Sequence, residues 1–175
     1  MQNSTLSFRQ ATSSDLEAIL NFPQDKTELF YFFPSASYPL TQAQLEAQLS
    51  ERYESTVMLD LKLAPKQQVI GFANFYNVEN HNIAFIGNVI IKPEKRQQGL
   101  GKKLVQTMVA IGFQQLGLNE VHLSCYSQNT KALLFYQHLG FKPYAIEQRK
   151  DFNQQSTAMI HFKIKRKAFL ATFQS

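Results

Sequence analysis

The segment from Val89 to Lys103 constrains the fold of this 175-residue chain more than any other stretch. It opens with a β-branched run, passes through a basic loop that holds Gly99 and Gly101, and continues into apolar residues with helical spacing. The start of a helix presents unpaired backbone N–H groups and a partial positive charge, and glycine lets an anion approach that backbone closely. The segment therefore predicts a strand, a loop and a helix that together bind a phosphate-like anion.

Two familiar phosphate motifs do not fit this glycine spacing. A Walker loop needs four residues between its first glycine and the Gly-Lys-Ser/Thr triplet, whereas here only Leu100 separates Gly99 from Gly101. A dinucleotide fingerprint needs a third glycine, at the position where this chain has Leu104. The anion site is therefore of another kind.

Hydrophobic periodicity predicts the order β-α-α-β-β-β-α-β-α-β-β. Strands are predicted at Leu6–Gln10, Val57–Leu63, Val69–Val78, Ile83–Ile91, Val121–Tyr126, Phe141–Lys150 and Thr157–Lys165. Helices are predicted from the caps Thr12, Ser13 and Ser14 to about Phe22, from Thr41 through Tyr53, from Leu100 to Leu116, and over Ala132 to Tyr136 ahead of Gly140. Turns are predicted at Pro65–Gln67 and Glu79–Asn82, and an aromatic loop at Phe30–Pro39.

Length and composition favour one globular domain over residues 1–175. The chain has 44% hydrophobic residues and 15 Phe, enough for a packed core, and it contains no repeat, low-complexity tract or Gly/Ser linker. Met1–Gln10 lacks the apolar core of a secretory signal, and no run approaches the roughly 20 apolar residues of a membrane span. The single cysteine suits a reducing compartment, so we expect a cytoplasmic protein that does not meet a membrane.

Two blocks of sequence resemble one enzyme family. Arg-x-x-Gly-x-Gly at residues 96–101 resembles the pyrophosphate-binding motif of the GNAT superfamily, and Asn-x-x-Ala-x-x-x-Tyr-x-x-x-Gly-Phe at residues 129–141 is similar to a second block of that superfamily. The resemblance implies an α/β (α+β) fold, with a mixed, mostly antiparallel twisted sheet of about seven strands flanked by about four helices. It also implies transfer of an acetyl group from acetyl-CoA to a primary amine of a small molecule, peptide or protein.

The resemblance further implies which residues hold acetyl-CoA. The end of one strand pairs with the pantetheine arm where two parallel strands separate, and the loop and helix start hold the pyrophosphate. The residues in these roles are Val89, Ile90 and Ile91, then Arg96, Gln97, Gln98, Gly99, Leu100, Gly101 and Lys102. Asn129 and Ala132 are expected beside the cofactor arm, and Tyr136 is expected to protonate the leaving sulfur. Helical spacing independently places these last three on one face.

The group that removes the amine proton is not evident. In this family a neutral amine attacks the thioester carbonyl directly, so its proton needs an acceptor. One branch of the family has a glutamate where this chain has Phe85, and another branch has one where it has Ser124. Glu28 or Glu79 acting through water, or the solvent itself, are the alternatives, and we assign no base from the sequence.

The acceptor side is expected at the aromatic loop before the second predicted helix. Similar proteins place the acceptor pocket there, which makes Glu28, Tyr31 and Phe32 the candidate substrate-binding residues. Residues 1–80 carry 5 basic and 9 acidic side chains, a net charge of −4, whereas residues 81–175 carry 13 and 4, a net charge of +9. This asymmetry favours the CoA anion at the C-terminal half and a cationic acceptor at the N-terminal half.

Other functional interpretations have less support. Covalent chemistry at Cys125 needs a nearby imidazole, and His122 points to the opposite face of the same predicted strand. The four histidines, His161 included, lack metal-ligand spacing, so we expect them to be structural or exposed and predict no metal. The alternative class is a binding module: either a catalytically weak GNAT-fold domain that senses acetyl-CoA, or a nucleic-acid-binding module. The second would use Lys163, Lys165, Arg166 and Lys167, which match no nucleic-acid motif. We expect a monomer or homodimer that acts on a small-molecule or peptidyl amine.

Overall fold

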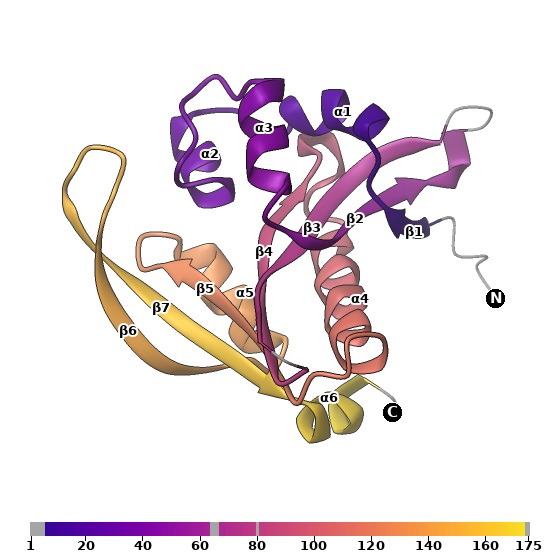
Figure 1. Ribbon diagram of the computed structural model, residues 1–175, viewed down its shortest axis with the longest axis vertical. Helices are drawn as coiled ribbons and strands as arrows, with labels where there is room; N and C mark the ends of the chain where they lie inside the picture. Colours follow the sequence, from indigo (N-terminus) through magenta and orange to yellow (C-terminus); the bar gives the residue numbers. More distant parts are fainter. Residues whose placement is uncertain (1–5, 64–66, 80, 174–175) are drawn as a thin grey trace.

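The computed structural model describes residues 6–63, 67–79 and 81–173, which form one seven-stranded sheet flanked by helices (Figure 1). The strands are β1 Leu6–Gln10, β2 Tyr53–Asp60, β3 Gln68–Glu79, β4 Ile83–Ile91, β5 Glu120–Tyr126, β6 Lys142–Lys150 and β7 Ser156–Lys165. The α-helices are α1 Leu16–Leu20, α2 Lys26–Phe32, α3 Gln42–Leu49, α4 Leu100–Gln114, α5 Thr130–His138 and α6 Arg166–Phe173. Short 3₁₀ turns lie at Ser13–Asp15, Leu61–Leu63 and Pro93–Lys95.

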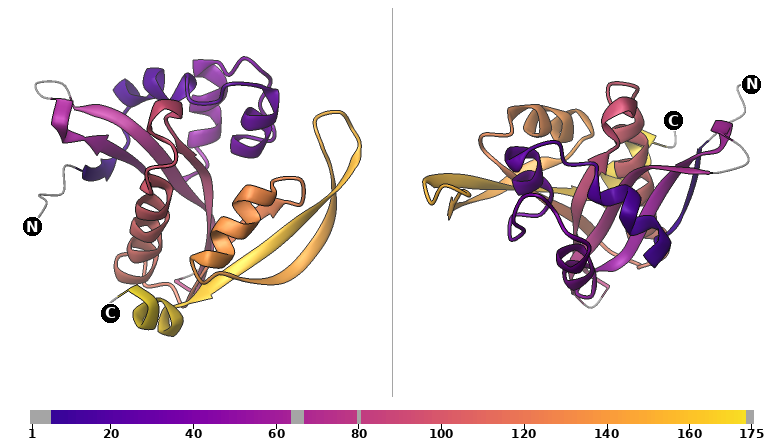
Figure 2. Two further views of the ribbon diagram at one scale, coloured as in Figure 1. Left: turned by 180° about the vertical axis from the view of Figure 1, so that it is seen from behind. Right: turned by 90° about the horizontal axis from the view of Figure 1, so that it is seen from above.

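The sheet has the strand order β1-β2-β3-β4-β5-β7-β6. All neighbouring strands are antiparallel except β4 and β5, which run parallel. The predicted mixed, mostly antiparallel sheet of seven strands is therefore confirmed. The β6–β7 hairpin extends away from the rest of the sheet (Figures 1 and 2), and the Phe152 ring in its turn lies 5.5 Å from the Phe30 ring of α2.

Alternation along the strands divides the apolar side chains between two faces of the sheet. In β2, Val57 and Leu59 pack with α1, α2 and α3 in one cluster, whereas Met58 packs with α4 in the other. Leu104 and Met108 of α4 are both completely buried in this second cluster. Each such side chain contributes about 1.5–3 kcal/mol when removed from water, so the two clusters hold the central strands in register.

Of the predicted helix caps, Thr12 and Thr41 are confirmed as N-caps, whereas Ser13 and Ser14 lie inside the 3₁₀ turn that follows Thr12. Thr12 and Thr41 each precede a helical segment and make a reciprocal capping box, with Asp15 and Gln44 as the respective partners. The helix after Thr41 ends at Leu49, earlier than predicted, because the next residues turn into β2 and pair with β3.

The prediction of a loop over Phe30–Pro39 is wrong for its first part, because residues 30–32 belong to α2. The Asp25 carboxylate caps this helix by accepting a hydrogen bond from the Glu28 backbone N–H at 2.8 Å. The helix has only seven residues, too few to show a clear period in the sequence.

Two other predicted boundaries also change. The strand predicted to reach Leu63 ends at Asp60, whose carboxylate accepts from the Lys62 N–H at 3.0 Å and begins a 3₁₀ turn. The last strand leads into α6, which was not predicted because its first residues are basic. In the predicted turns, Pro65, Lys66 and Asn80 lie outside the described residues.

Candidate active site

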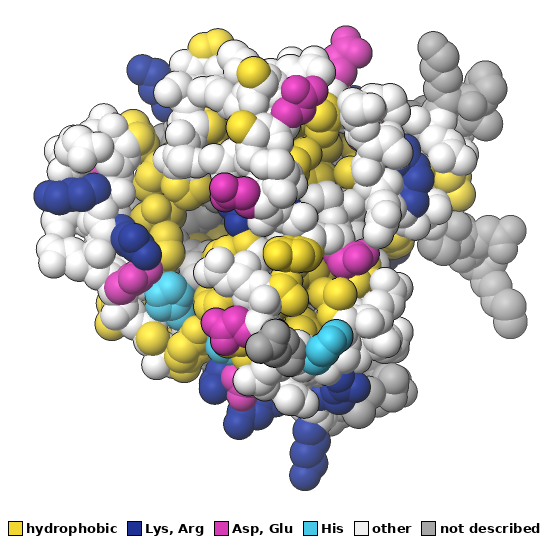
Figure 3. Space-filling model, viewed as in Figure 1, with side chains coloured by type: hydrophobic (Ala, Val, Ile, Leu, Met, Phe, Trp, Pro, Cys, Tyr) yellow, Lys and Arg dark blue, Asp and Glu magenta, His cyan; other side chains and the backbone are white. Residues whose placement is uncertain are grey.

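The parallel strands β4 and β5 separate halfway along their length. They pair from Ile83 with Glu120 to Ile86 with Leu123, and no further pair joins them beyond that point in the described residues. An extra residue in β4 shifts its register with β3 here, and Asn88 takes the left-handed backbone conformation with a φ of 53°. A cavity of about 990 Å³ opens where the strands part. In the space-filling view, a hollow bordered by many hydrophobic side chains lies beside the β6–β7 arm (Figure 3).

The loop between β4 and α4 lies at one end of this cavity. Gln97 and Gly99 have φ values of 59° and 74°, which bring the loop sharply into the start of α4 at Leu100. A Cβ added at Gly99 meets nothing within 4 Å, so glycine is needed here for its backbone conformation rather than for space. The 15-residue helix α4 adds the partial positive charge of its N-terminus.

Most of the predicted cofactor residues line the cavity. Those that do are Val89, Ile90, Ile91, Arg96, Gln97, Gly101, Asn129, Ala132 and Tyr136. Gln98, Gly99 and Lys102 are exposed around the start of α4, just beside it. The Leu100 side chain is buried in the core, so only its backbone is available to a ligand there.

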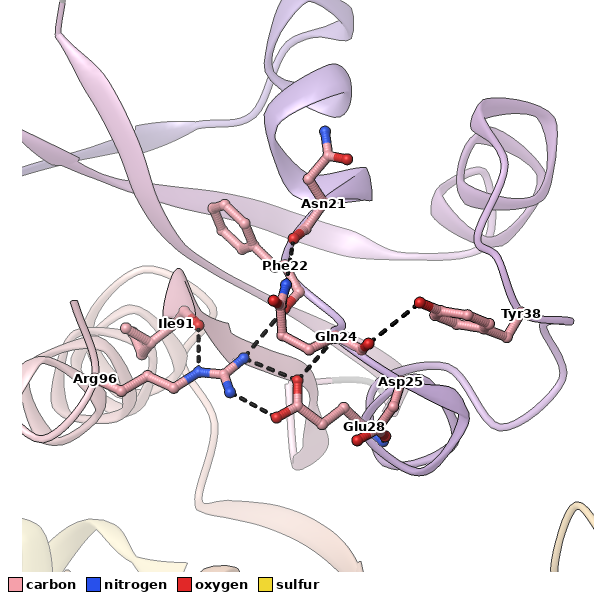
Figure 4. Close-up of polar contacts among 8 residues, drawn as sticks. All are labelled: Asn21, Phe22, Gln24, Asp25, Glu28, Tyr38, Ile91 and Arg96. Atoms are coloured by element: carbon pink, nitrogen blue, oxygen red, sulfur yellow. Dashed lines mark hydrogen bonds and ion pairs between the residues drawn. The ribbon is translucent and has the colours of Figure 1, made fainter. Parts of the chain in front are cut away.

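Arg96 and Glu28, predicted on opposite sides of the site, are joined by an ion pair (Figure 4). The two guanidinium nitrogens of Arg96 donate to the two carboxylate oxygens of Glu28 at 2.6 and 3.0 Å. Arg96 also donates to the backbone oxygens of Ile91 and Phe22, both at 3.1 Å. The side chain thereby links the end of β4 to α2 and the segment before it. Glu28 is consequently a poor candidate for a free general base.

Tyr136 reaches the cavity from α5. The Asn129 side chain caps this helix by accepting from the Ala132 N–H at 3.2 Å, which fixes the face that α5 presents. Burial, together with nearby Cys125 and Tyr76, raises the pKa of Tyr136 and keeps its hydroxyl protonated. That hydroxyl makes no hydrogen bond to any described residue, so it is available to a ligand.

The expected acceptor residues occupy two different environments. Tyr31 lines the cavity, with its ring 6.4 Å from that of Tyr126. The Phe32 ring packs in the core against Phe33 and Phe72, although its residue still borders the cavity. The Phe32 carbonyl accepts from Asn88 Nδ2 at 2.5 Å, which ties α2 to the irregular part of β4.

A polar cluster that sequence reasoning missed lies in the cavity wall around His161. Its Nδ1 is 2.8 Å from Ser124 Oγ, and its Nε2 is 3.3 Å from a Glu147 carboxylate oxygen. The Tyr76 hydroxyl donates to Ser124 Oγ at 3.5 Å, and the Phe85 ring centre lies 6.2 Å from that of His161. His161 is half-buried rather than exposed, and it lines the cavity. Ser124 and His161 lie opposite each other because β5 pairs with β7. This pairing of distant strands cannot be predicted from a local sequence pattern.

The structure argues against covalent chemistry at Cys125. Burial raises the pKa of this thiol to about 12, so it is protonated at neutral pH. His122 is instead held by Glu120 and Tyr144, at 3.0 and 2.8 Å. No imidazole therefore activates the thiol within the described part of the chain.

Residues 6–63, 67–79 and 81–173 contain neither a cluster of metal-ligating side chains nor a membrane-spanning helix. No cluster of three or more His, Cys, Asp or Glu in these ranges is arranged to hold a metal ion. No helix within the same ranges has the length and apolar character needed to cross a membrane.

Comparison with known proteins identifies the family. The model of the acetyltransferase (GNAT) family matches residues 17–141, more than half of the chain. The spermidine N(1)-acetyltransferase of Vibrio cholerae serotype O1 is 22% identical over 141 residues, covering 79% of this chain and 80% of that protein.

Solved structures show the same fold. A spermidine N-acetyltransferase from Vibrio cholerae, in complex with CoA and spermine, superposes with a TM-score of 0.79 at 22% identity, over 96% of this chain and 99% of that one. A Vibrio cholerae spermidine/spermine N-acetyltransferase in complex with manganese ions gives a TM-score of 0.76 at 20% identity, over 99% of both chains. The chain therefore belongs to the acetyltransferase (GNAT) family and is an acetyl-CoA-dependent N-acetyltransferase.

Proposed function

We propose that acetyl-CoA lies between the separated ends of β4 and β5, with its pantetheine arm along Val89–Ile91 and its pyrophosphate at residues 97–102. The observation that carries this proposal is the parting of β4 from β5 beside the start of α4. On the β5 side, no described strand pairs with β4 beyond Ile86, so an extended ligand finds backbone donors and acceptors there. The unpaired N–H groups at the start of α4 and the nearby lysines suit a diphosphate.

Tyr136 donates the proton that the departing CoA sulfur needs. An ordinary tyrosine has a pKa of about 10 and a thiol one of about 8.5, so transfer of the phenol proton to a free thiolate in water is uphill by about 2 kcal/mol. The raised pKa keeps Tyr136 protonated at neutral pH, and the burial that raises it also disfavours a charged thiolate, so the phenol donates its proton to the sulfur as the C–S bond breaks. The absence of a hydrogen bond from its hydroxyl to any described residue leaves the donor free for the sulfur.

Ser124, His161 and Glu147 remove the amine proton as a relay. With the ring hydrogen on Nε2, His161 donates to Glu147, and its Nδ1 accepts from the Ser124 hydroxyl. The Ser124 oxygen then takes the amine proton as its own proton passes to His161. Phe85 and Ser124, the two positions where family branches have glutamate, both lie against this imidazole. The imidazole therefore stands where those carboxylates would act.

Thermal unfolding with acetyl-CoA tests the cofactor site. Saturation at about 100 times Kd stabilises a native state by about 2.7 kcal/mol, so the melting temperature should rise by roughly 5–10 °C for a domain of this size. Gly99→Glu places bulk and negative charge where the pyrophosphate is proposed, and it should abolish the rise.

Gly117→Glu is the matched control for the glycine variant. Gly117 also has a positive φ, of 69°, and it lies beyond the other end of α4 from Gly99. Both variants should lose stability through backbone strain of about 1 kcal/mol, but Gly117→Glu should keep the acetyl-CoA effect. An unchanged melting temperature for the wild type, with no calorimetric heat, would contradict the proposal.

The proposed acceptor is a primary amine on a small molecule or peptide. The relatives are named for spermidine, so polyamines belong in an acceptor panel beside amino acids, aminoglycosides and peptides. We place the enzyme in the cytoplasm as a monomer or homodimer, in keeping with one buried, reduced cysteine.

The nucleic-acid alternative finds no support in the basic residues that suggested it. Lys163 pairs with Glu120 at 3.0 Å, and the Arg166 guanidinium donates to the Leu118 carbonyl at 2.6 Å. Both side chains thus already stabilise the end of the sheet and the start of α6.

A further inference from the structure

The charged side chains of the cavity are unequally paired. The carboxylate of Glu28 is held by Arg96, and that of Glu147 is held by Arg149 at 2.8 Å and by His161. Each carboxylate therefore already has a cationic or imidazole partner. The opposite net charges of the two halves of the sequence suggested a cationic acceptor. Among the described residues that line this cavity, however, there is no unpaired carboxylate to bind such a cation.

Among the described cationic side chains that line the cavity, Arg52 and Lys131 have no ion pair, and of these two Arg52 is half-buried whereas Lys131 is exposed. Arg52 lies between α3 and β2, lines the cavity, and has no ion pair or side-chain hydrogen bond within the described residues. Its Nε is buried without any partner, and its guanidinium lies 4.9 Å from the centre of the Tyr76 ring. Burial is the larger influence on Arg52 and lowers its pKa, so a bound anion would relieve the cost of holding this charge.

The position of Arg52 separates it from the proposed pyrophosphate site. The Tyr76 ring packs on the Phe85 ring at 5.3 Å, near the point where β4 and β5 part. The loop that leads to α4 begins after Ile91, six residues farther along β4, which corresponds to about 20 Å. Arg52 therefore faces the acceptor end of the cavity.

Arg52 and the proton relay share the Tyr76 side chain. The guanidinium of Arg52 lies over its ring, and its hydroxyl donates a hydrogen bond to Ser124 Oγ. An acceptor that presents its amine to Ser124 and reaches Arg52 must therefore span roughly one tyrosine side chain. A dipeptide spans about 7 Å when extended, which suits this separation.

We propose that the acceptor carries a carboxylate as well as the primary amine, and that Arg52 binds this carboxylate while Ser124 and His161 receive the amine. The inference rests on the proposed function and names the chemical class of its acceptor: short peptides and ω-amino acids. A bidentate Arg–carboxylate contact fixes orientation as well as affinity, so it aligns the amine with the relay.

The test compares matched acceptors by CoA release and product mass. Dipeptides and ω-amino acids are paired with their carboxamides, which keep the amine and lose the negative charge, and spermidine is included as an acceptor without an anion. We expect kcat/KM for each acid to exceed that of its amide by at least about tenfold.

Arg52→Gln should raise KM for the acids by about 10- to 100-fold, leave KM for the amides and for acetyl-CoA unchanged, and alter kcat little. Arg52→Lys retains the charge and should recover part of the preference, which guards against a simple loss of folding. Lys131→Gln removes another positive charge from the cavity wall, and it should leave the acid-to-amide ratio as in the wild type.

Equal or better use of amides or spermidine by the wild type would overturn the inference, as would an equal loss on all acceptors in Arg52→Gln. Inactivity on every acceptor would also overturn it. Calorimetry with acetyl-CoA alone then decides the separate question of whether the proposed cofactor site fails as well.

Discussion

Replacing Tyr136 by phenylalanine should separate catalysis from folding. The ring keeps its packing against Phe135 and Phe141, whose centres lie 5.3 and 6.1 Å away. The hydroxyl has no hydrogen-bond partner among the described residues, so its removal leaves no partner unsatisfied and should change the free energy of unfolding by less than about 0.5 kcal/mol. The melting temperature should therefore move by no more than about 2 °C.

The expected loss of rate is far larger than this structural effect. A general acid is worth about 10²- to 10⁴-fold, which corresponds to about 2.7–5.5 kcal/mol in the barrier. Because the pKa of Tyr136 is raised, deprotonation of this phenol should not reduce wild-type activity below about pH 10.

The assay for Tyr136→Phe is single-turnover release of CoA, followed with a thiol reagent. The only cysteine of the chain is buried and should not interfere. Tyr53→Phe, at an exposed tyrosine on β2, serves as the control. A single-turnover rate within about threefold of the wild type would refute the role of Tyr136 as the acid.

Three further predictions follow from the same contacts. His161→Gln should lower kcat by about 10²-fold with little change in KM for acetyl-CoA, and added imidazole should restore part of the rate. A loss of rate that imidazole does not restore would indicate that His161 serves only in packing. The hydrogen bond from Lys95 lowers the pKa of Asp60, so this pair adds stability above the unfolded pKa of about 3.9 and loses it as the pH falls through the folded value. Asp60→Asn should lower the melting temperature at pH 7 by up to about 4 °C and reduce the acid dependence, whereas an unchanged pH profile would contradict the pairing. Cys125, with a pKa of about 12, should have about 10³-fold less thiolate at pH 8 than a free thiol, so native alkylation should be slow and should become fast on unfolding.

The sequence predicted the elements whose patterns are long and local. The bounds of β4 were predicted without error, and α4 was predicted within two residues of its end, because each has a sustained period and clear terminal signals. The start of α3 was predicted from Thr41 as its N-cap. In contrast, α2 and the 3₁₀ turn after β2 depend on single side-chain caps, at Asp25 and Asp60, which a periodicity argument does not weigh.

The parts of the site that were missed are contacts between distant segments. Ser124 and His161 meet only because β5 pairs with β7, whose register is set by the whole sheet. Arg96 and Glu28 are 68 residues apart, and nothing near either residue predicts their ion pair. The two side chains therefore bind each other, although the sequence suggested Arg96 for the cofactor and Glu28 for the acceptor. Motif spacing indicated the proposed cofactor loop, whereas the contacts around Arg96 and His161 could be found only in the folded structure.

The most direct test of the central claim is the mass of the product formed from acetyl-CoA and a primary amine. With purified wild-type protein, the account predicts one molecule of singly acetylated amine for each molecule of CoA released. The Gly99→Glu variant should form no product at the same acetyl-CoA concentration. Release of CoA without an acetylated amine over the whole acceptor panel, or equal product from Gly99→Glu, would contradict transfer from a cofactor held between β4 and β5.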